Sequence, residues 1–294
     1  MIAVVTDTCA CIPPSVVENL QIEIVPYYLH RGAETLRDGV DITGEEFYRW
    51  LPTARQLPTT ANPGPGDYLA AFERVAGRGS QIVVVLTMTS KGSGAYQSAC
   101  VAREMAAARM PRVRVEVIDT LQVAMVHGWA AIEAARAARE GAEINEVATA
   151  ARYVCDRGCM LKTADTLCYL YMRGRIGRAR HLLGSLLSIK PIIGMQEGII
   201  VALGQARSIP QAYARMVELM AERGAADCPI RVAITHAAAP DRAAALLNLV
   251  TDAFDCREVL MSQLSPVLGV HTGPGCEGLS FFPLQSVRTV HDGS

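Results

Sequence analysis

The stretch Leu86–Ala99, LTMTSKGSGAYQSA, follows an apolar run, QIVVVL, and connects a predicted strand to a predicted helix. The run Ile82–Leu86 is short, continuous and rich in β-branched residues, which is typical of a strand buried on both faces of a parallel sheet. Small and long residues alternate at helical spacing over Ala95–Ala108. We therefore expect Ser93 and Gly94 to lie in the turn between this strand and this helix.

A strand-to-helix turn of this composition is suited to binding an anion. The first backbone N–H groups of the helix and the positive end of its dipole point at one spot, and small residues allow a ligand to come close. The hydroxyl of Ser93 would add one donor. From this stretch alone, Ser93 could equally act as a cap of its own helix.

Further strands and helices alternate through the first half of the chain. Apolar runs at Ile2–Val5 and Val113–Ile118 predict strands, and helical patterns cover Pro65–Val75 and Val123–Arg139. This alternation indicates an α/β fold with a parallel sheet and helices on both of its faces.

Two shorter features lie between these elements. Thr43 and Glu46 have the spacing of a capping box, which predicts the start of a short helix. Residues 57–66, LPTTANPGPG, are so rich in proline and glycine that we expect a loop.

The second half of the chain has a different order of predicted strands and helices. A hairpin is predicted around Glu197–Gly198, followed by helices at Ile209–Ala221 and Asp241–Phe254 with the strand-like IRVAITH between them. Hairpins beside helices favour an α+β arrangement. We expect two domains: residues 1–160 form a parallel α/β domain, and residues 161–294 form an α+β domain with the hairpin.

An Asp-Thr pair follows two of the predicted strands, at Asp7 and at Asp119. In parallel α/β sheets, ligands gather beyond the carboxyl ends of the strands, so both pairs and the Ser93 turn would share one rim. Each aspartate could equally cap a helix.

Composition and charge exclude several classes of protein. The formal net charge of −1 over 294 residues gives no support to nucleic acid binding. Nine cysteines without paired CxxC modules indicate a reducing cytoplasm, and MIAVVTD resembles a first strand more than a signal peptide. The most apolar region is interrupted by Lys190, Pro191 and Glu197, so we expect no membrane-spanning segment.

Common catalytic and metal-binding motifs are missing. The sequence has neither GxxxxGK[ST] nor GxGxxG after a strand, and the GxSxG elbow fails at Ser93 because Lys91 lies two residues before it. We expect no metal site and interpret the closely spaced cysteines as core or incidental thiols. These cysteines are Cys9, Cys11, Cys155 and Cys159.

Two stretches carry chemistry that the predicted fold does not explain. The basic run MRGRIGRARH, residues 172–181, fits a docking surface or an anion clamp. His271 lies between an apolar run and a turn with Gly273 and Gly275, whose lack of side chains suits close approach of the backbone to another group. A structural role and a functional role for His271 both remain open.

Eight motifs in this order resemble the DegV family of bacterial lipid-binding proteins, which includes the fatty-acid-binding subunits of fatty acid kinase. They are TDT, TANPGPGDY, TSKGSGAYQSA, VIDT, YMRGRIGRA, LLSIKPII, ITHA and VLGVHTGPG, and they extend from Thr6 to Gly275. The resemblance implies a two-domain fold that holds a long-chain fatty acid, with the carboxylate near the domain junction. It further implies a separate ATP-dependent kinase that converts the bound acid to an acyl phosphate, so that this chain is a cytoplasmic binding subunit without any other cofactor.

The resemblance also implies roles for individual residues. Thr60 matches a hydroxyl that contacts the carboxylate, Ser93 matches the serine of the family's turn, and Gly94 would supply a backbone N–H. Arg175 and His271 match an arginine and a histidine near the head group, and both would support phosphoryl transfer as cations.

Arg207 matches an arginine associated with kinase docking or phosphoryl transfer. Three residues depart from the family pattern: Ala61 replaces a hydroxyl, Gly92 replaces a leucine, and Arg173 replaces a glycine. The first change removes a possible donor to the carboxylate, and the third adds a cation.

Two other functions remain possible from the sequence. Ser93 and His271 could form a hydrolytic triad with Asp7 or Asp119, which would make the chain a serine esterase or acyltransferase. Alternatively, the chain could be a lipid sensor or transport module that needs no kinase.

Overall fold

The computed structural model describes residues 1–184 and 189–284, which form a mixed α/β protein with two main sheets. The first sheet has four parallel strands in the order β2-β1-β6-β7. The valines of its central strands are fully buried, as the continuous apolar runs predict. Its strands are β1 Ile2–Asp7, β2 Glu23–Val25, β6 Ile82–Thr87 and β7 Arg114–Asp119.

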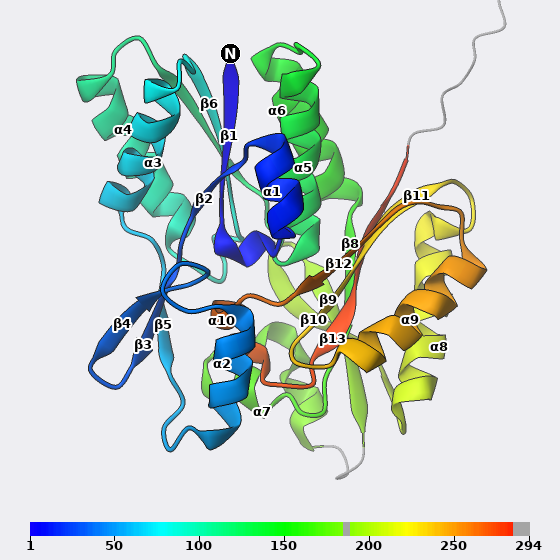
Figure 1. The fold of residues 1–294 in the computed structure, drawn as a ribbon. Helices are drawn as coiled ribbons and strands as arrows, with labels where there is room; N and C mark the ends of the chain where they lie inside the picture. Colours follow the sequence, from blue (N-terminus) through cyan, green and yellow to red (C-terminus); the bar gives the residue numbers. More distant parts are fainter. Residues whose placement is uncertain (185–188, 285–294) are drawn as a thin grey trace, which may run out of the picture.

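Helices cover both faces of this sheet (Figure 1). Helices α3 (Pro65–Gly77) and α4 (Ala95–Arg109) lie on one face. On the other lie α1 (Pro14–Leu20), α5 (Met125–Arg139) and α6 (Ile144–Arg157). The buried side of α4 consists of alanines, and their small side chains let the helix lie close to its neighbours.

A small three-stranded sheet, in the order β4-β3-β5, extends from the first sheet. It consists of β3 (Tyr28–Arg31), β4 (Glu34–Arg37) and β5 (Thr59–Ala61). The prediction of a loop over residues 57–66 is wrong at β5, because Thr59–Ala61 pairs with β3 despite its proline and glycine neighbours. The capping box of Thr43 and Glu46 is confirmed at the start of α2 (Gly44–Trp50), which precedes the short η2 (Leu51–Thr53).

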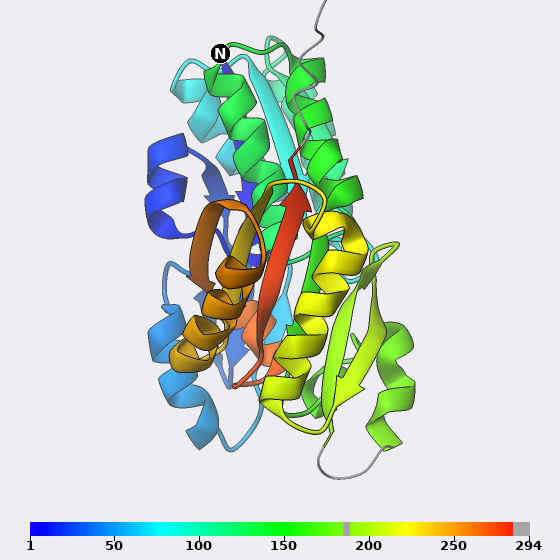
Figure 2. The same cartoon turned by 90° about the vertical axis from the view of Figure 1, so that its right-hand side faces the viewer.

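The second main sheet has six strands in the order β10-β9-β8-β13-β11-β12. Helices α8 and α9 cover one face (Figure 2), and α5 packs on the other, where the Trp129 and Phe282 rings lie 5.7 Å apart. The strands are β8 Cys159–Thr163, β9 Lys190–Gln196, β10 Ile199–Ala206, β11 Ile230–His236, β12 Cys256–Gln263 and β13 Glu277–Pro283. The helices are α7 Cys168–Met172, α8 Ile209–Met220, α9 Pro240–Ala253 and α10 Pro266–Thr272, with short turns η1 Thr8–Ala10, η3 Gly177–Gly184 and η4 Ala221–Ala225.

The predicted hairpin is confirmed, since β9 and β10 meet in a turn at Glu197 and Gly198, where φ is 53° and 78°. No strand is predicted from the sequence at β2, β8 or β13, and β8 begins at Cys159, ahead of the expected boundary at residue 161. The first three residues of the LLSIKPII motif and the last ten residues of the chain lie outside the described residues.

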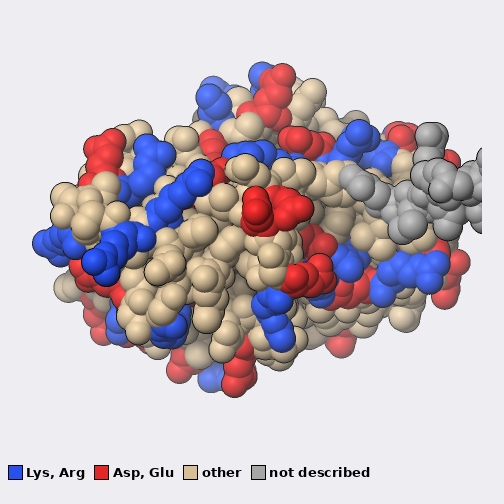
Figure 3. Space-filling model, turned by 90° about the horizontal axis from the view of Figure 1, so that it is seen from above, with Lys and Arg blue, Asp and Glu red and all other residues tan. Residues whose placement is uncertain are grey.

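Acidic and basic side chains are interspersed over the face seen from above (Figure 3). All nine cysteines are free thiols. In the described part of the chain, no helix combines the length and the apolar character needed to cross a bilayer.

Candidate functional site

A cavity of about 470 Å³ lies between the carboxyl rim of the four-stranded sheet and one face of the six-stranded sheet. This size is within the range of about 300 to 1,000 Å³ that small-molecule sites have. Its lining is mainly apolar and includes Met88, Val123, Met160, Leu170, Ile193, Met195, Ile200, Leu264, Val267 and Leu268.

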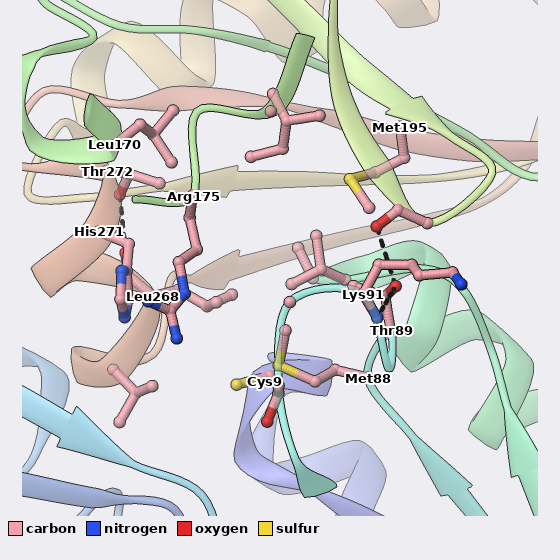
Figure 4. Close-up of a pocket in the computed structure, with 18 of the residues that line it drawn as sticks. Cys9, Met88, Thr89, Lys91, Leu170, Arg175, Met195, Leu268, His271 and Thr272 are labelled. Carbon is pink, nitrogen blue, oxygen red and sulfur yellow. Dashed lines mark hydrogen bonds between the residues drawn. The ribbon is translucent and has the colours of Figure 1, made fainter. Parts of the chain in front are cut away.

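All five residues predicted to bind a ligand line this cavity: Thr60, Ser93, Gly94, Arg175 and His271, here called the polar cluster. They come from β5, the β6–α4 turn, the segment after α7, and α10. Figure 4 shows Arg175 beside His271 on one side of the cavity, with Cys9, Met88 and Thr89 on the other.

Ser93 and Gly94 lie in the turn before α4, as the sequence predicts. The Ser93 hydroxyl accepts the N–H of Ala95, the first residue of α4, at 3.2 Å, while Gly94 is the N-cap of this helix. Its oxygen lies 2.7 Å from the hydroxyl of Tyr27, which lines the cavity too. Burial raises the pKa of Tyr27 well above its usual value, so the phenol stays protonated and can donate.

Thr60 and His271 are joined across 211 positions of sequence, since Thr60 Oγ1 and His271 Nε2 lie 3.0 Å apart. The Nδ1 atom of His271 is buried and has no hydrogen-bond partner in the described structure. Burial lowers the pKa of His271 to about 4, with Arg175 and Arg173 adding to the shift. His271 is therefore neutral at pH 7, which differs from the cationic role that the resemblance implies.

Two arginines lie close to His271. Arg175 is exposed and donates from Nη1 to the carbonyl of Arg173 at 2.9 Å. Arg173, which departs from the family pattern, donates from Nη2 to the carbonyl of Pro58 at 2.6 Å. The Arg173 side chain thus connects the segment after α7 to the residue preceding β5, and it brings a second positive charge close to His271.

Asn62 lies between Thr60 and the Ser93–Gly94 turn of the polar cluster, and it was not singled out from the sequence. A Cβ atom at Gly94 would lie 3.0 Å from Asn62 Oδ1, so the glycine gives this side chain room at the start of α4. Asn62 Nδ2 donates to Pro63 and to Ser98 Oγ. Because Asn62 directly follows β5, it places Thr60 near the Ser93 turn.

Helix α10, which carries His271, begins over a buried carboxylate that the sequence analysis also missed. Ser265 caps this helix, and Asp38 Oδ2 accepts the N–H of Val267 at 3.3 Å. Asp38 is 1% exposed, and burial raises its pKa to about 7.

Lys162 is another cavity residue that the sequence did not single out. It is 3% exposed, on β8 in the middle of the six-stranded sheet. The sequence signal that could have identified Lys162 is a single charged residue inside the apolar run CMLKTA.

Asp7 caps a short helical turn, as the sequence allows, whereas Asp119 caps no helix and accepts N–H groups of two loops instead. Asp7 caps η1 through the N–H of Cys9 and also accepts the N–H of Met88 at 3.0 Å. Asp119 Oδ1 accepts the N–H groups of Ser90 and Leu121, each at 3.1 Å. Both carboxylates hold the rim loops in place.

The hydrolytic triad does not form. Ser93 is bonded to Tyr27 and Ala95, and His271 is bonded to Thr60. The fully buried Asp7 lies 4.0 Å from His127 Nδ1, so its nearest imidazole is a different one. This geometry speaks against the esterase alternative.

Arg207 lies away from the cavity. It is exposed between β10 and α8, where its backbone N–H donates to Gln211 Oε1. Within residues 1–184 and 189–284, no group of three or more His, Cys, Asp and Glu side chains could hold a metal ion.

The fold and the cavity define a two-part α/β protein with a largely apolar binding site between its sheets and a polar cluster in the lining of that site. A family model described as "Uncharacterised protein, DegV family" matches residues 1–284, and the chain belongs to this family.

The relatives match along nearly their whole length. A DegV domain-containing protein of Streptomyces coelicolor is 35% identical over 279 residues, covering 95% of this chain and 97% of the relative. A solved structure, "Fatty Acid Binding of a DegV family Protein from Thermus thermophilus", is 28% identical with a TM-score of 0.88, covering 96% of this chain and 99% of that one. The structure of "DegV, a fatty acid binding protein from Bacillus subtilis" is 27% identical with a TM-score of 0.86, covering 96% and 99%.

Proposed function

We propose that this protein binds a long-chain fatty acid in the cavity and presents its carboxylate to a separate ATP-dependent kinase, which forms an acyl phosphate. The observation that carries the proposal is the cavity itself, because an apolar lining and a polar cluster are the two things an ionised fatty acid needs. Two family members with solved structures are described as fatty-acid-binding.

The apolar lining would supply most of the affinity. Each buried methylene stabilises by about 0.8 kcal/mol, so about a dozen of them supply on the order of 10 kcal/mol before association costs are subtracted. The carboxylate must keep hydrogen bonds when it leaves water, since an unpaired buried charge costs several kcal/mol. Thr60, Ser93 and the N–H groups that begin α4 are the donors for it.

Arg175 and Arg173 are the cations of this proposal, and neutral His271 is a hydrogen-bonding group. The carboxylate is itself the nucleophile and is ionised at pH 7, so the chain needs no general base. As negative charge develops on the transferred phosphoryl group, the exposed guanidinium of Arg175 stabilises it. Arg207 would contact the kinase from the exposed loop before α8.

Extraction and mass spectrometry of lipid from the purified protein test the binding, with native mass spectrometry for stoichiometry. We expect one fatty acid per chain. Leu268→Trp fills the cavity wall and should abolish retention, whereas Leu249→Trp, the same change at a position on α9 that is 44% exposed, should not. A protein that carries no lipid and takes none up would refute the proposal.

Acyl phosphate formation with ATP and a fatty acid kinase tests the second step. We expect Ser93→Ala to weaken lipid retention modestly, and Arg175→Ala to preserve binding while suppressing phosphorylation. Equal loss of lipid in both variants would contradict this division of roles. Lipid binding without acyl phosphate would favour a sensor or transport module.

A further inference from the structure

Lys162 places a buried basic side chain in the wall of the apolar cavity. The side chain is 3% exposed and lines the cavity from β8, among apolar neighbours that include Met160 and Ile193. Buried lysines are rare unless they are paired, because the ammonium loses its hydration.

The neighbouring strands are adapted to this side chain. Lys162 is in register with Gly278 on β13, and Gly278 is in register with Thr235 on β11. The Lys162 amine donates to Thr235 Oγ1 at 2.5 Å, so its stem crosses the strand between them. A Cβ atom at Gly278 would lie 2.8 Å from Lys162 Cγ, and the glycine therefore makes this crossing possible.

The protein does not satisfy all the hydrogen-bond donors of the Lys162 amine. Over the described part of the chain, Thr235 is its one hydrogen-bond partner and no carboxylate lies within 4.0 Å. Glu277, next to Gly278, is bonded to Arg242 and Tyr213 instead. Burial raises the pKa of Cys11 to about 12, so that thiol supplies no anion. A lysine amine has three N–H donors when protonated and two when neutral, so at least one remains open beside Thr235.

Lys162 is separate from the polar cluster. The titratable groups near His271 are Arg175 and Arg173, whereas those near Lys162 are Cys276, Cys11 and Glu277. The polar cluster comes from loops and short elements, and Lys162 comes from the six-stranded sheet. A ligand that fills the cavity with its carboxylate at the polar cluster therefore meets Lys162 along its chain.

We propose that Lys162 forms a second polar subsite, and that the preferred ligand is a fatty acid with a hydroxyl or carbonyl oxygen on its chain. This inference rests on the proposed fatty acid binding. A plain methylene chain leaves the open donors of Lys162 without water and without an acceptor, whereas an oxygen at that position accepts from them. Sites with such donors reject analogues that lack the acceptor.

Competition binding with stearic acid and a series of hydroxystearic acids, the hydroxyl placed at successive chain positions, tests the inference. We expect one positional isomer to bind at least about tenfold more tightly than stearic acid, which is about 1.4 kcal/mol. Lys162→Met keeps the length of the side chain and removes the donors, so it should abolish this preference and raise the melting temperature. Lys91→Met is the matched control, because Lys91 lines the same cavity but is exposed.

The outcomes are distinguishable. Loss of the preference in Lys162→Met and its retention in Lys91→Met support the subsite. Equal affinities across the series, or a preference that survives Lys162→Met, overturn it while fatty acid binding stands. If no fatty acid binds, the proposed function fails first and the subsite with it. The series on the unmodified protein decides the question even if Lys162→Met does not fold.

Discussion

Replacing Asp38 by Asn should remove a large pH dependence from the stability of the protein. Burial raises the pKa of this carboxyl from 3.8 to about 7, so the folded state binds the proton more tightly than the unfolded state. Stability is then fully present below about pH 4 and is lost as the pH rises towards about 7. For these two pKa values, the loss between about pH 5 and pH 8 is roughly 2 to 3 kcal/mol.

Urea unfolding of both proteins at about pH 5 and pH 8 measures this effect. His271 has the opposite sign, because its pKa is lowered to about 4 and its contribution is lost as the pH falls from 6.5. Both proteins contain His271, so its contribution cancels when the unfolding free energy of one protein is subtracted from that of the other. Between about pH 5 and pH 8, we expect the unfolding free energy of Asp38→Asn to rise by about 2 kcal/mol relative to that of the unmodified protein. Parallel pH profiles would refute the reasoning, because Asp38 would then be ionised in the folded state.

The remaining predictions concern packing and the polar cluster. Gly278→Ala should destabilise by about 1 to 3 kcal/mol or more in thermal unfolding, because its Cβ would lie 2.1 Å from the backbone oxygen of Leu161. Gly66→Ala, at a position with nothing within 4 Å, is the matched control and should not destabilise; equal losses would contradict the packing argument. Thr60→Val removes the hydrogen-bond partner of His271. It should weaken fatty acid retention by about tenfold, because a hydrogen bond contributes about 1 kcal/mol or more. Unchanged retention would exclude Thr60 as a donor to the carboxylate.

The two central strands of the first sheet, β1 and β6, could be predicted because they are buried on both faces, whereas the short edge strand β2 was not predicted. The continuous run QIVVVL leaves no other interpretation once helices flank it, and the ends of β6 and α4 differ from the predicted ends by one residue each. Strand β5 could not be predicted, because three residues between prolines carry no periodicity and their pairing with β3 is a tertiary contact.

The same limit applies to the site. The motifs led to the five residues of the polar cluster, which line one cavity. Tyr27 and Asn62 carry no local pattern, since their place depends on contacts with Ser93 and Gly94 far along the chain. The low pKa of His271 follows from burial and from two arginines, neither of which is visible in the motif HTGPG.

The contact between Thr60 and His271 spans 211 positions, and the bond of Val267 to Asp38 spans 229. During synthesis the N-terminal half of the protein leaves the ribosome long before α10 exists, and domains fold as they emerge. The cavity lacks one wall throughout that time. It is completed only when nearly the whole chain has been translated, so a ligand has to enter a finished protein and cannot be enclosed by the growing chain.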